Sequence, residues 1–320
     1  MTILLTGGTG FIGRHLSARS HDADKTAMVR LVRSTLHPDF DERTDLAGDL
    51  ANAADVDQFV RAGSTLVHLA CNGNPRSSNR DIIADLEQNL LPTVRLFERF
   101  AIRQPRGHVI FASTGGDMYS FDPPHHPRRE ENPPTPQSSH SIHKLAAERY
   151  LGQFCRLYGI AGTILRIGNS YGDPVPEKTT HGLIGVALRT LFTGRQMAVI
   201  DPLSSVRDYI HLDDLCDVFR AMIANPPSSG VCRVLNVGSG IGHSIAEVFK
   251  LIERVTGRAV NWRDEIPPGR PSSWNVLDTT RLRSLTGWRA RIDLEQGIAM
   301  LWRRYEQLYA SRQEPTTSAS

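Results

Sequence analysis

The chain has 320 residues, of which 40% are hydrophobic and 22% charged, a composition typical of a globular protein large enough for two packed lobes. With 37 basic and 34 acidic side chains the net charge is only +3, which argues against a nucleic-acid binder. The four cysteines show no metal-ligand spacing, so we expect free thiols and no bound metal. Neither a signal peptide nor a transmembrane run is predicted. We therefore expect a cytoplasmic protein with no membrane partner.

Through the first half of the chain, short apolar runs alternate with stretches of helical periodicity. This alternation predicts an α/β fold with a parallel sheet covered by helices on both faces. The predicted strands are residues 3–6, 27–32, 65–70, 108–112 and 162–167, and the predicted helices are residues 11–20, 52–62, 81–103 and 138–157.

We expect a Rossmann-type, doubly wound domain made by residues 1–170 plus 206–240. The remaining segments are less regular and richer in proline, arginine and tryptophan. They predict a smaller, mixed α/β substrate lobe, residues 171–205 plus 241–310, at the carboxyl edge of the sheet. Residues 311–320 are expected to form a disordered tail.

A glycine-rich turn follows the first predicted strand and opens the first predicted helix. Glycines here let the backbone turn tightly and approach a pyrophosphate, while the helix N-terminus offers free N–H groups to the phosphates. The turn therefore predicts a dinucleotide site. The expected contacts are Gly7, Gly10, Phe11, Ile12 and Gly13.

The second predicted strand ends at the position that contacts the adenosine ribose. An acid there would bind the 2′-hydroxyl of NAD, but this chain has Arg33, which favours the 2′-phosphate of NADP. We therefore predict NADP(H), with NAD(H) as the alternative. Loops after the next two strands add the expected cofactor contacts Asp49, Leu50, Leu69 and Ala70.

These and later motifs resemble the extended short-chain dehydrogenases/reductases, in the NAD(P)-dependent nucleotide-sugar epimerase/dehydratase family, and most of all its UDP-glucose 4-epimerase-like branch. The matching motifs are residues 6–13, 68–70, 113–116, 165–172, 207–211, 235–240 and 285–288. The resemblance implies a nucleotide-diphosphate sugar held between the lobes and a hydride exchanged with the nicotinamide. It also implies substrate contacts from Ser113, Asn169, Arg207 and Arg270, and a homodimer paired through helices 81–103 and 138–157.

The catalytic motif departs from the family pattern. The family uses a tyrosine and a lysine four residues apart on one helix, and this chain has His140 and Lys144. We expect His140 to carry the proton, Lys144 to lower its pKa and hold the nicotinamide ribose, and Thr114 to bond the reacting oxygen. His143 is an alternative proton carrier.

Three functions stay open at this point. The first is NADPH-dependent reduction of a nucleotide-diphosphate 4-ketosugar, which Arg33 favours. The second is C4 epimerisation of a nucleotide-diphosphate hexose with retained NAD, which the resemblance favours. The third is a cofactor-binding protein with lost catalysis, which the missing tyrosine suggests. A 4,6-dehydratase is disfavoured because only one acid, Asp117, stands where that reaction needs two.

Overall fold

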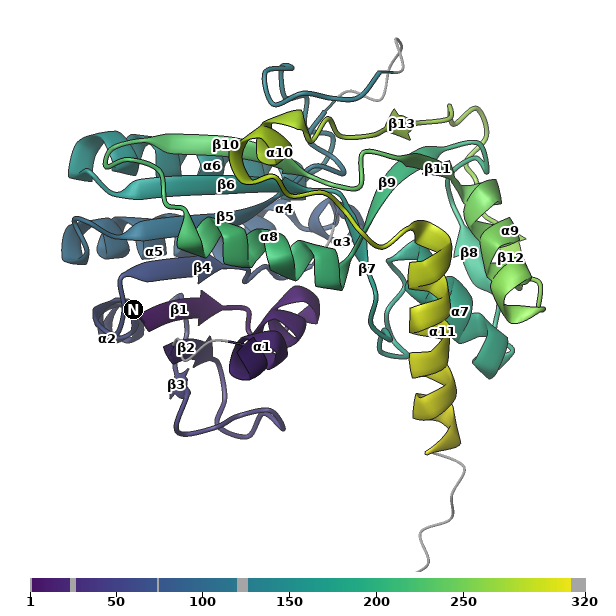
Figure 1. Cartoon of the computed structure of the whole chain (residues 1–320), viewed down its shortest axis with the longest axis horizontal. Helices are drawn as coiled ribbons and strands as arrows, with labels where there is room; N and C mark the ends of the chain where they lie inside the picture. Colours follow the sequence, from purple (N-terminus) through teal and green to yellow (C-terminus); the bar gives the residue numbers. More distant parts are fainter. Residues whose placement is uncertain (1, 24–26, 74, 120–125, 312–320) are drawn as a thin grey trace, which may run out of the picture.

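The computed structural model describes residues 2–23, 27–73, 75–119 and 126–311, and its largest element is a seven-stranded parallel sheet (Figure 1). The strand order is β10-β6-β5-β4-β1-β2-β3. The chain thus builds outward from β1 in one direction and then from β4 in the other, so the order reverses between these two strands. Open α/β sheets bind ligands at such a reversal point. The strands are β1 (Thr2–Thr6), β2 (Ala27–Val32), β3 (Asp45–Ala47), β4 (Thr65–His68), β5 (His108–Thr114), β6 (Ala161–Ile167) and β10 (Cys232–Val237).

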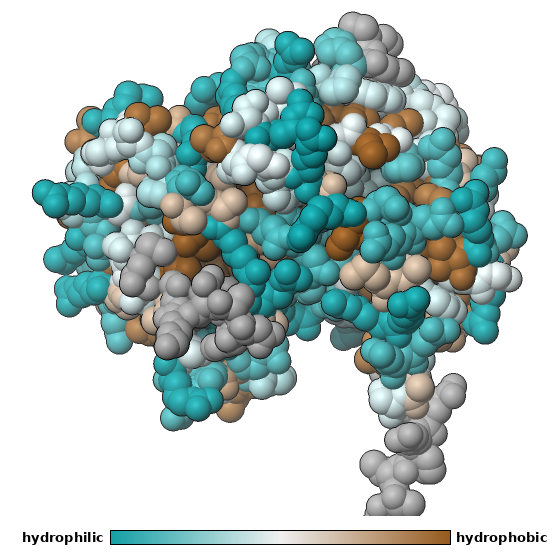
Figure 2. Space-filling model, viewed as in Figure 1, coloured by the Kyte–Doolittle hydropathy of each residue, from teal (hydrophilic) through white to brown (hydrophobic). Residues whose placement is uncertain are grey.

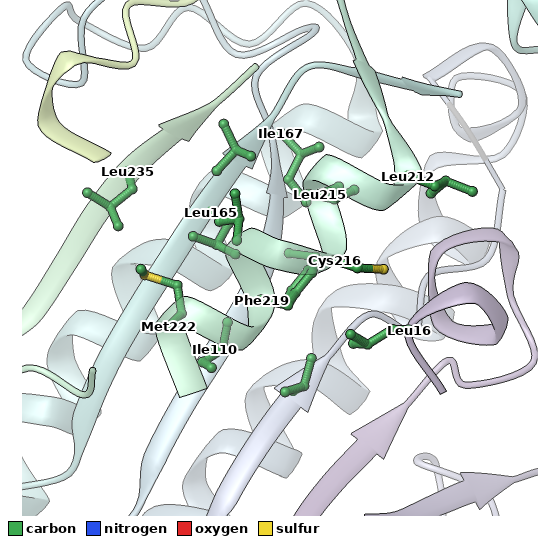
Figure 3. Close-up of a cluster of buried hydrophobic side chains, with 14 of the residues drawn as sticks. Leu16, Ile110, Leu165, Ile167, Leu212, Leu215, Cys216, Phe219, Met222 and Leu235 are labelled. Carbon is green, nitrogen blue, oxygen red and sulfur yellow. The ribbon is translucent and has the colours of Figure 1, made fainter. Parts of the chain in front are cut away.

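Helices cover both faces of this sheet, because its strands are apolar on both sides. One face carries α1 (Phe11–Ala23) and α8 (Leu212–Ala224), and the other carries α2 (Ala53–Arg61), α5 (Leu91–Arg103) and α6 (Ser139–Tyr158) (Figure 1). Figure 3 shows the α8 side chains Leu215, Phe219 and Met222 lying against strand residues of the sheet. Each fully buried side chain of this size contributes roughly 1.5–3 kcal/mol. The predicted doubly wound fold is confirmed.

A smaller region follows the carboxyl ends of the strands. Its four-stranded sheet contains β7 (Asn169–Tyr171), β9 (Val206–His211), β11 (Gly242–Ser244) and β13 (Trp274–Asn275), and a second, two-stranded sheet pairs β8 (Met197–Val199) with β12 (Trp262–Asp264). The helices α7 (Leu183–Thr193), α9 (Ile245–Thr256) and α11 (Leu294–Ala310) pack around a separate apolar cluster.

The exact lobe boundaries stay a prediction, but one assigned segment packs elsewhere. Leu282 of α10 (Thr280–Thr286) and Trp288 belong to the core of the large sheet, although we expected residues 241–310 in the smaller lobe. The reason is that α10 lies against β10 and buries Leu282 completely there. All but Ser311 of the predicted tail lies outside the described residues.

The predicted helix over residues 81–103 is interrupted. It consists of α4 (Ile82–Asp85), a π-helical turn, η1 (Leu86–Leu90), and α5, with a short helix, α3 (Pro75–Ser78), before it. Pro92 stands at the start of α5 and has no N–H to donate to the preceding turn. Such π turns are frequent at functional sites. Within the described residues, no helix is both long and apolar enough to cross a bilayer.

A buried ion pair ties α6 to the sheet. Arg166 Nη2 of β6 lies 2.7 Å from Glu148 Oε2 of α6, and both side chains are almost completely buried. Glu148 also accepts a 2.6 Å hydrogen bond from Ser113, and Arg166 donates at 2.9 Å to the Tyr119 hydroxyl. The contacts to Glu148 help to raise the pKa of Arg166, against the effect of its burial, so the charge of the guanidinium persists.

We expect Glu148→Ala to lower the free energy of unfolding by about 3–5 kcal/mol, because it leaves the Arg166 charge buried and unpaired. The control is Glu295→Ala, which breaks the exposed pair with Arg254 and should cost at most about 1 kcal/mol. Denaturant unfolding of both variants measures the difference. Equal losses would contradict a structural role for the buried pair.

Candidate active site

The glycine turn leaves no room for side chains where a phosphate would rest. Gly7 has a φ of +71°, and a Cβ added to it would lie 2.6 Å from the backbone nitrogen of Ala70. A Cβ on Gly13 would overlap the carbonyl oxygen of Gly7, so α1 packs directly on the turn. Helix α1 then begins at Phe11 with no acidic residue in its first turn. Close backbone and a helix N-terminus free of negative charge suit an anionic pyrophosphate.

Two arginines near the end of β2 have different surroundings. The side chain of Arg30 lies against Gly8, and its guanidinium makes two hydrogen bonds of 2.6 Å to Asp45, so it is used inside the protein. Arg33, one residue beyond β2, is exposed. Arg33 is therefore accessible to a ligand at the carboxyl edge of the strand.

The other expected cofactor residues lie at the same edge of the sheet. Asp49 accepts a 2.8 Å hydrogen bond from the backbone of Ala51, which fixes the loop after β3. Leu50 and Leu69 are partly buried against the two cores, and Ala70 lies against Gly7. The loops after β1 and β4 therefore meet.

A buried histidine connects the elements next to these two loops. His68 Nδ1 lies 2.6 Å from the Thr6 hydroxyl, and its Nε2 lies 2.9 Å from the Thr93 hydroxyl. Burial, with a smaller effect of Lys144, lowers the pKa of His68 to about 3, so the ring is neutral near pH 7. Its role is to connect β1, β4 and α5. The sequence showed His68 only as part of a motif, without these partners.

The first two turns of α6 carry three candidate side chains to one cavity. Ser138 caps the helix, with a reciprocal hydrogen bond to Ser141, and so fixes where the helix begins. His140, His143 and Lys144 all line the cavity, which has a volume of about 10 Å³. Its other lining residues include Cys71, Asp85, Asn89, Thr93 and Phe111.

Lys144 is held against the end of β5. Its Nζ donates a 2.8 Å hydrogen bond to the carbonyl oxygen of Ala112 and lies 4.8 Å from the centre of the Phe111 ring. The lysine charge thus lies near the carboxyl end of β5, the strand that pairs with β4. Lys144 and His140 line the same cavity.

His140 is neutral at neutral pH. Its burial, and then the positive charge of Lys144, lower the pKa of the imidazole to about 4. Its Nδ1 lies 3.7 Å from Cys71 Sγ, and its backbone N–H donates to the Ser78 hydroxyl at 3.1 Å. A neutral ring can both donate and accept a proton, but it holds no extra proton.

Thr114 and Ser113 point to different environments. The Ser113 hydroxyl is buried and bound to Glu148, so the structure gives it a structural partner where we had expected a substrate contact. Thr114 is partly exposed, and its Oγ1 and the side chain of Asn169 both lie within 4 Å of the position that a Cβ on Gly116 would occupy. The structure therefore brings Thr114 and Asn169 together and leaves Ser113 out.

The two arginines expected to bind pyrophosphate share one carboxylate. Arg270 Nε donates to Asp201 Oδ1 at 2.6 Å, and Arg207 Nη2 lies 3.7 Å from Asp201 Oδ2. Burial lowers the pKa of Arg207, while the negative charges of Asp201 and Asp117 act in the opposite direction. A third residue thus holds the predicted pair side by side.

Sequence reasoning missed three of these residues. Asp85, Cys71 and Asp201 belong to no motif, and only the four-residue spacing of Asp85 and Asn89 on a helix could have signalled their contact. Among the residues that the structure describes, no three histidine, cysteine or acidic side chains are grouped to hold a metal.

Residues 3–238 match the model of the NAD dependent epimerase/dehydratase family. The chain is 30% identical to a UDP-glucose 4-epimerase of Mycolicibacterium smegmatis, over 93% of this chain and 96% of that one. It is 26% identical to a dTDP-4-dehydro-6-deoxyglucose reductase of Escherichia coli, over 93% and 96%. Its fold is similar to the crystal structure of UDP-glucose 4-epimerase from Thermus thermophilus in complex with NAD, with a TM-score of 0.85, 25% identity and coverage of 96% and 99%. The chain therefore belongs to the NAD dependent epimerase/dehydratase family, whose members act on nucleotide sugars.

Proposed function

We propose that this enzyme uses NADPH to reduce the keto group, at C4, of a nucleotide-diphosphate 4-ketosugar. The observation that carries the proposal is the exposed Arg33 at the end of β2, where a 2′-phosphate would need a cation. The reductase among the relatives supports this reaction class. Net reduction uses a cofactor that leaves after each turnover, and NADPH is the usual donor for it.

The residues present fit a dinucleotide. The glycine cradle has backbone where a Cβ would otherwise stand, and the N-terminus of α1 faces it. When bound, the reduced nicotinamide supplies the hydride. Gly7, Gly10, Phe11, Ile12 and Gly13 would hold the pyrophosphate, Asp49 and Leu50 the adenine end, and Leu69 and Ala70 the nicotinamide side. Lys144 would hold the nicotinamide ribose.

The chain's own residues would then place the sugar and move the proton. Arg207 and Arg270 would offer their guanidinium groups to the substrate pyrophosphate, and both lie beside Asp201. Asn169 would contact the diphosphate or sugar. Thr114 would bond the carbonyl oxygen, and His140 would deliver a proton to it.

A second candidate is C4 epimerisation with retained NAD. The names of the two epimerases favour it, and one of them was solved with NAD. The two reactions differ in their balance: the reductase consumes NADPH with a ketosugar, whereas the epimerase interconverts sugars without net change of the cofactor.

We also propose a homodimer through the outer face of α5 and α6. This layer carries several large apolar side chains that are about half exposed. Figure 2 shows the opposite face of the molecule, on which hydrophilic side chains are mixed with small apolar patches. The exposed large hydrophobic residues on these two helices are Leu91, Ile102, Ile142, Tyr150, Leu157 and Tyr158. We further propose a reducing, cytoplasmic location, which the four free cysteines support.

For the cofactor, we expect wild-type protein to bind NADPH more tightly than NADH. Arg33→Ala should lower this preference by about 10- to 100-fold, because it removes charge-assisted hydrogen bonds. Fluorescence titration measures both dissociation constants. Arg43→Ala, at another exposed arginine of the same region, is the control and should leave the ratio unchanged. Tighter NADH binding by the wild type would refute the preference.

For catalysis, we expect His140→Ala to reduce kcat with dTDP-4-dehydro-6-deoxyglucose at least about 100-fold, within the range that general acid–base groups contribute. NADPH affinity should stay within a few-fold, because His140 lies outside the glycine cradle. Absorbance at the nicotinamide band follows the reaction. His108→Gln serves as the control: it alters a buried histidine at the opposite end of β5, whose Nε2 lies 2.9 Å from the Thr163 hydroxyl. A fully active His140→Ala would remove this residue from the mechanism.

For assembly, Leu157→Glu should convert the dimer to a monomer, because it places a charge in the apolar face of α6. Light scattering coupled to size-exclusion chromatography gives the mass. Leu285→Glu makes the same change at an exposed leucine of α10 and should leave the dimer intact. A wild-type monomer would contradict the proposal.

A further inference from the structure

The cavity behind His140 contains a contact between a histidine and a carboxylate that the proposed reaction has not used. His143 Nδ1 lies 2.7 Å from Asp85 Oδ2, and these side chains are only 8% and 5% exposed. The contact is close, although Nδ1 has no aligned hydrogen-bond partner. A buried carboxylate at this distance favours a proton on the facing ring nitrogen.

Two hydrogen bonds hold the Asp85 carboxylate. Its Oδ1 accepts from Asn89 Nδ2 at 2.8 Å, and its Oδ2 accepts from the Ser139 hydroxyl at 2.8 Å. Asn89 in turn makes two hydrogen bonds to the backbone of Asn72, at 2.7 and 3.0 Å. The carboxylate is therefore positioned by η1, by α6 and, through Asn89, by the loop after β4, and its place does not depend on His143.

The proposed reaction lacks a source for its proton. His140 is neutral near pH 7, because burial and Lys144 lower its pKa, so it has no extra proton to give. Giving up its last ring proton without replacement would create an imidazole anion. A neutral ring can instead take a proton at one nitrogen while it releases one from the other. Such a transfer needs a second acid–base group beside the ring.

The cavity offers that group and a path to it. His140 and His143 are three residues apart on α6 and line the same cavity, which has room for about one water molecule. Nδ1 of His140 faces Cys71, another lining residue. The charged or titratable groups around the cavity are Asp85 from α4, Cys71 from the loop after β4, and Lys144 beside the two histidines.

We propose that His143, held by Asp85, is a positioning and proton-relay residue that resupplies His140 through one water in this cavity; this inference rests on the proposed reduction. The carbonyl carbon gains the hydride, and the carbonyl oxygen gains a proton from one nitrogen of His140. The other nitrogen of His140 takes a proton from the water, and the water takes one from His143. Solvent then returns a proton to His143, and tautomer exchange of the His140 ring returns its proton to the nitrogen that faces the carbonyl oxygen. Each turnover consumes one hydride and one proton.

The test compares His143→Gln and Asp85→Asn with wild type. Both variants keep side-chain volume, but the first cannot carry a proton and the second removes the charge that holds it. We expect kcat with dTDP-4-dehydro-6-deoxyglucose to fall about 10- to 100-fold in each and its pH profile to change, while KM and NADPH affinity stay within about two-fold. His108→Gln should match the wild type in kcat and pH profile. Thermal unfolding of all variants shows that they are folded.

A second readout does not depend on turnover. In wild type, ¹⁵N NMR of ring-labelled histidine should show His143 protonated at both ring nitrogens, Nδ1 toward Asp85 and Nε2 as the donor to the water, with His143→Gln assigning the signals; Asp85→Asn should lose the proton on Nδ1. A His143 protonated at only one ring nitrogen overturns the inference. Wild-type kcat and pH profile in both variants overturns the relay and leaves the reduction standing. Wild-type protein that reduces no nucleotide 4-ketosugar overturns the reduction and the relay together.

Discussion

The contact between Gly7 and Ala70 is the constraint on which the site depends. Because Gly7 has no Cβ, the turn after β1 lies directly on the loop after β4, and Gly13 lets α1 pack on the same turn. Next to these loops, His68 of β4 contacts Thr6 of β1 and Thr93 of α5. The point where strand order reverses is therefore filled by backbone, which is the surface that a pyrophosphate needs. Any side chain at Gly7 would both strain a positive φ and separate the two loops.

Burial then determines how the polar groups near this edge behave. It keeps the rings of His68 and His140 neutral near pH 7, and it makes the carboxylates of Glu148 and Asp85 depend on partners. Glu148 is neutralised by Arg166 and serves the packing of α6. Asp85 contacts His143 at a cavity, and His143 can gain or lose a proton there. Two buried acids on neighbouring helices thus have different roles, because one faces a permanent cation and the other a titratable group.

The sequence predicted the sheet well, because periodicity and turn glycines act locally. Apolar runs at β1, β4 and β5 are buried on both faces, and that burial leaves a direct pattern in the sequence. The π turn before Pro92 and the packing of Leu282 on the large sheet depend on tertiary contacts, so periodicity missed both. At the site, roles for motif residues such as Lys144 and Arg207 were predicted from the family resemblance. Asp85 and Asp201 were not, because their role comes from the side chains that folding brings to them.

If His140 stands where the resemblance implies a tyrosine, the neighbouring lysine has the opposite effect on proton supply. A nearby ammonium lowers the pKa of either group. For a phenol, this brings deprotonation closer to neutral pH while the neutral form still holds its proton. For an imidazole, it disfavours the charged form, which is the one that carries an additional proton and stays neutral after donating it, and burial acts in the same direction. A histidine at this position can therefore take a proton at one ring nitrogen while it releases one from the other, but near pH 7 it carries no additional proton. An active enzyme that uses it needs a second proton donor nearby. His143, about one helical turn from His140, provides a second imidazole, and Asp85 of α4 provides a carboxylate, at a cavity that both histidines line.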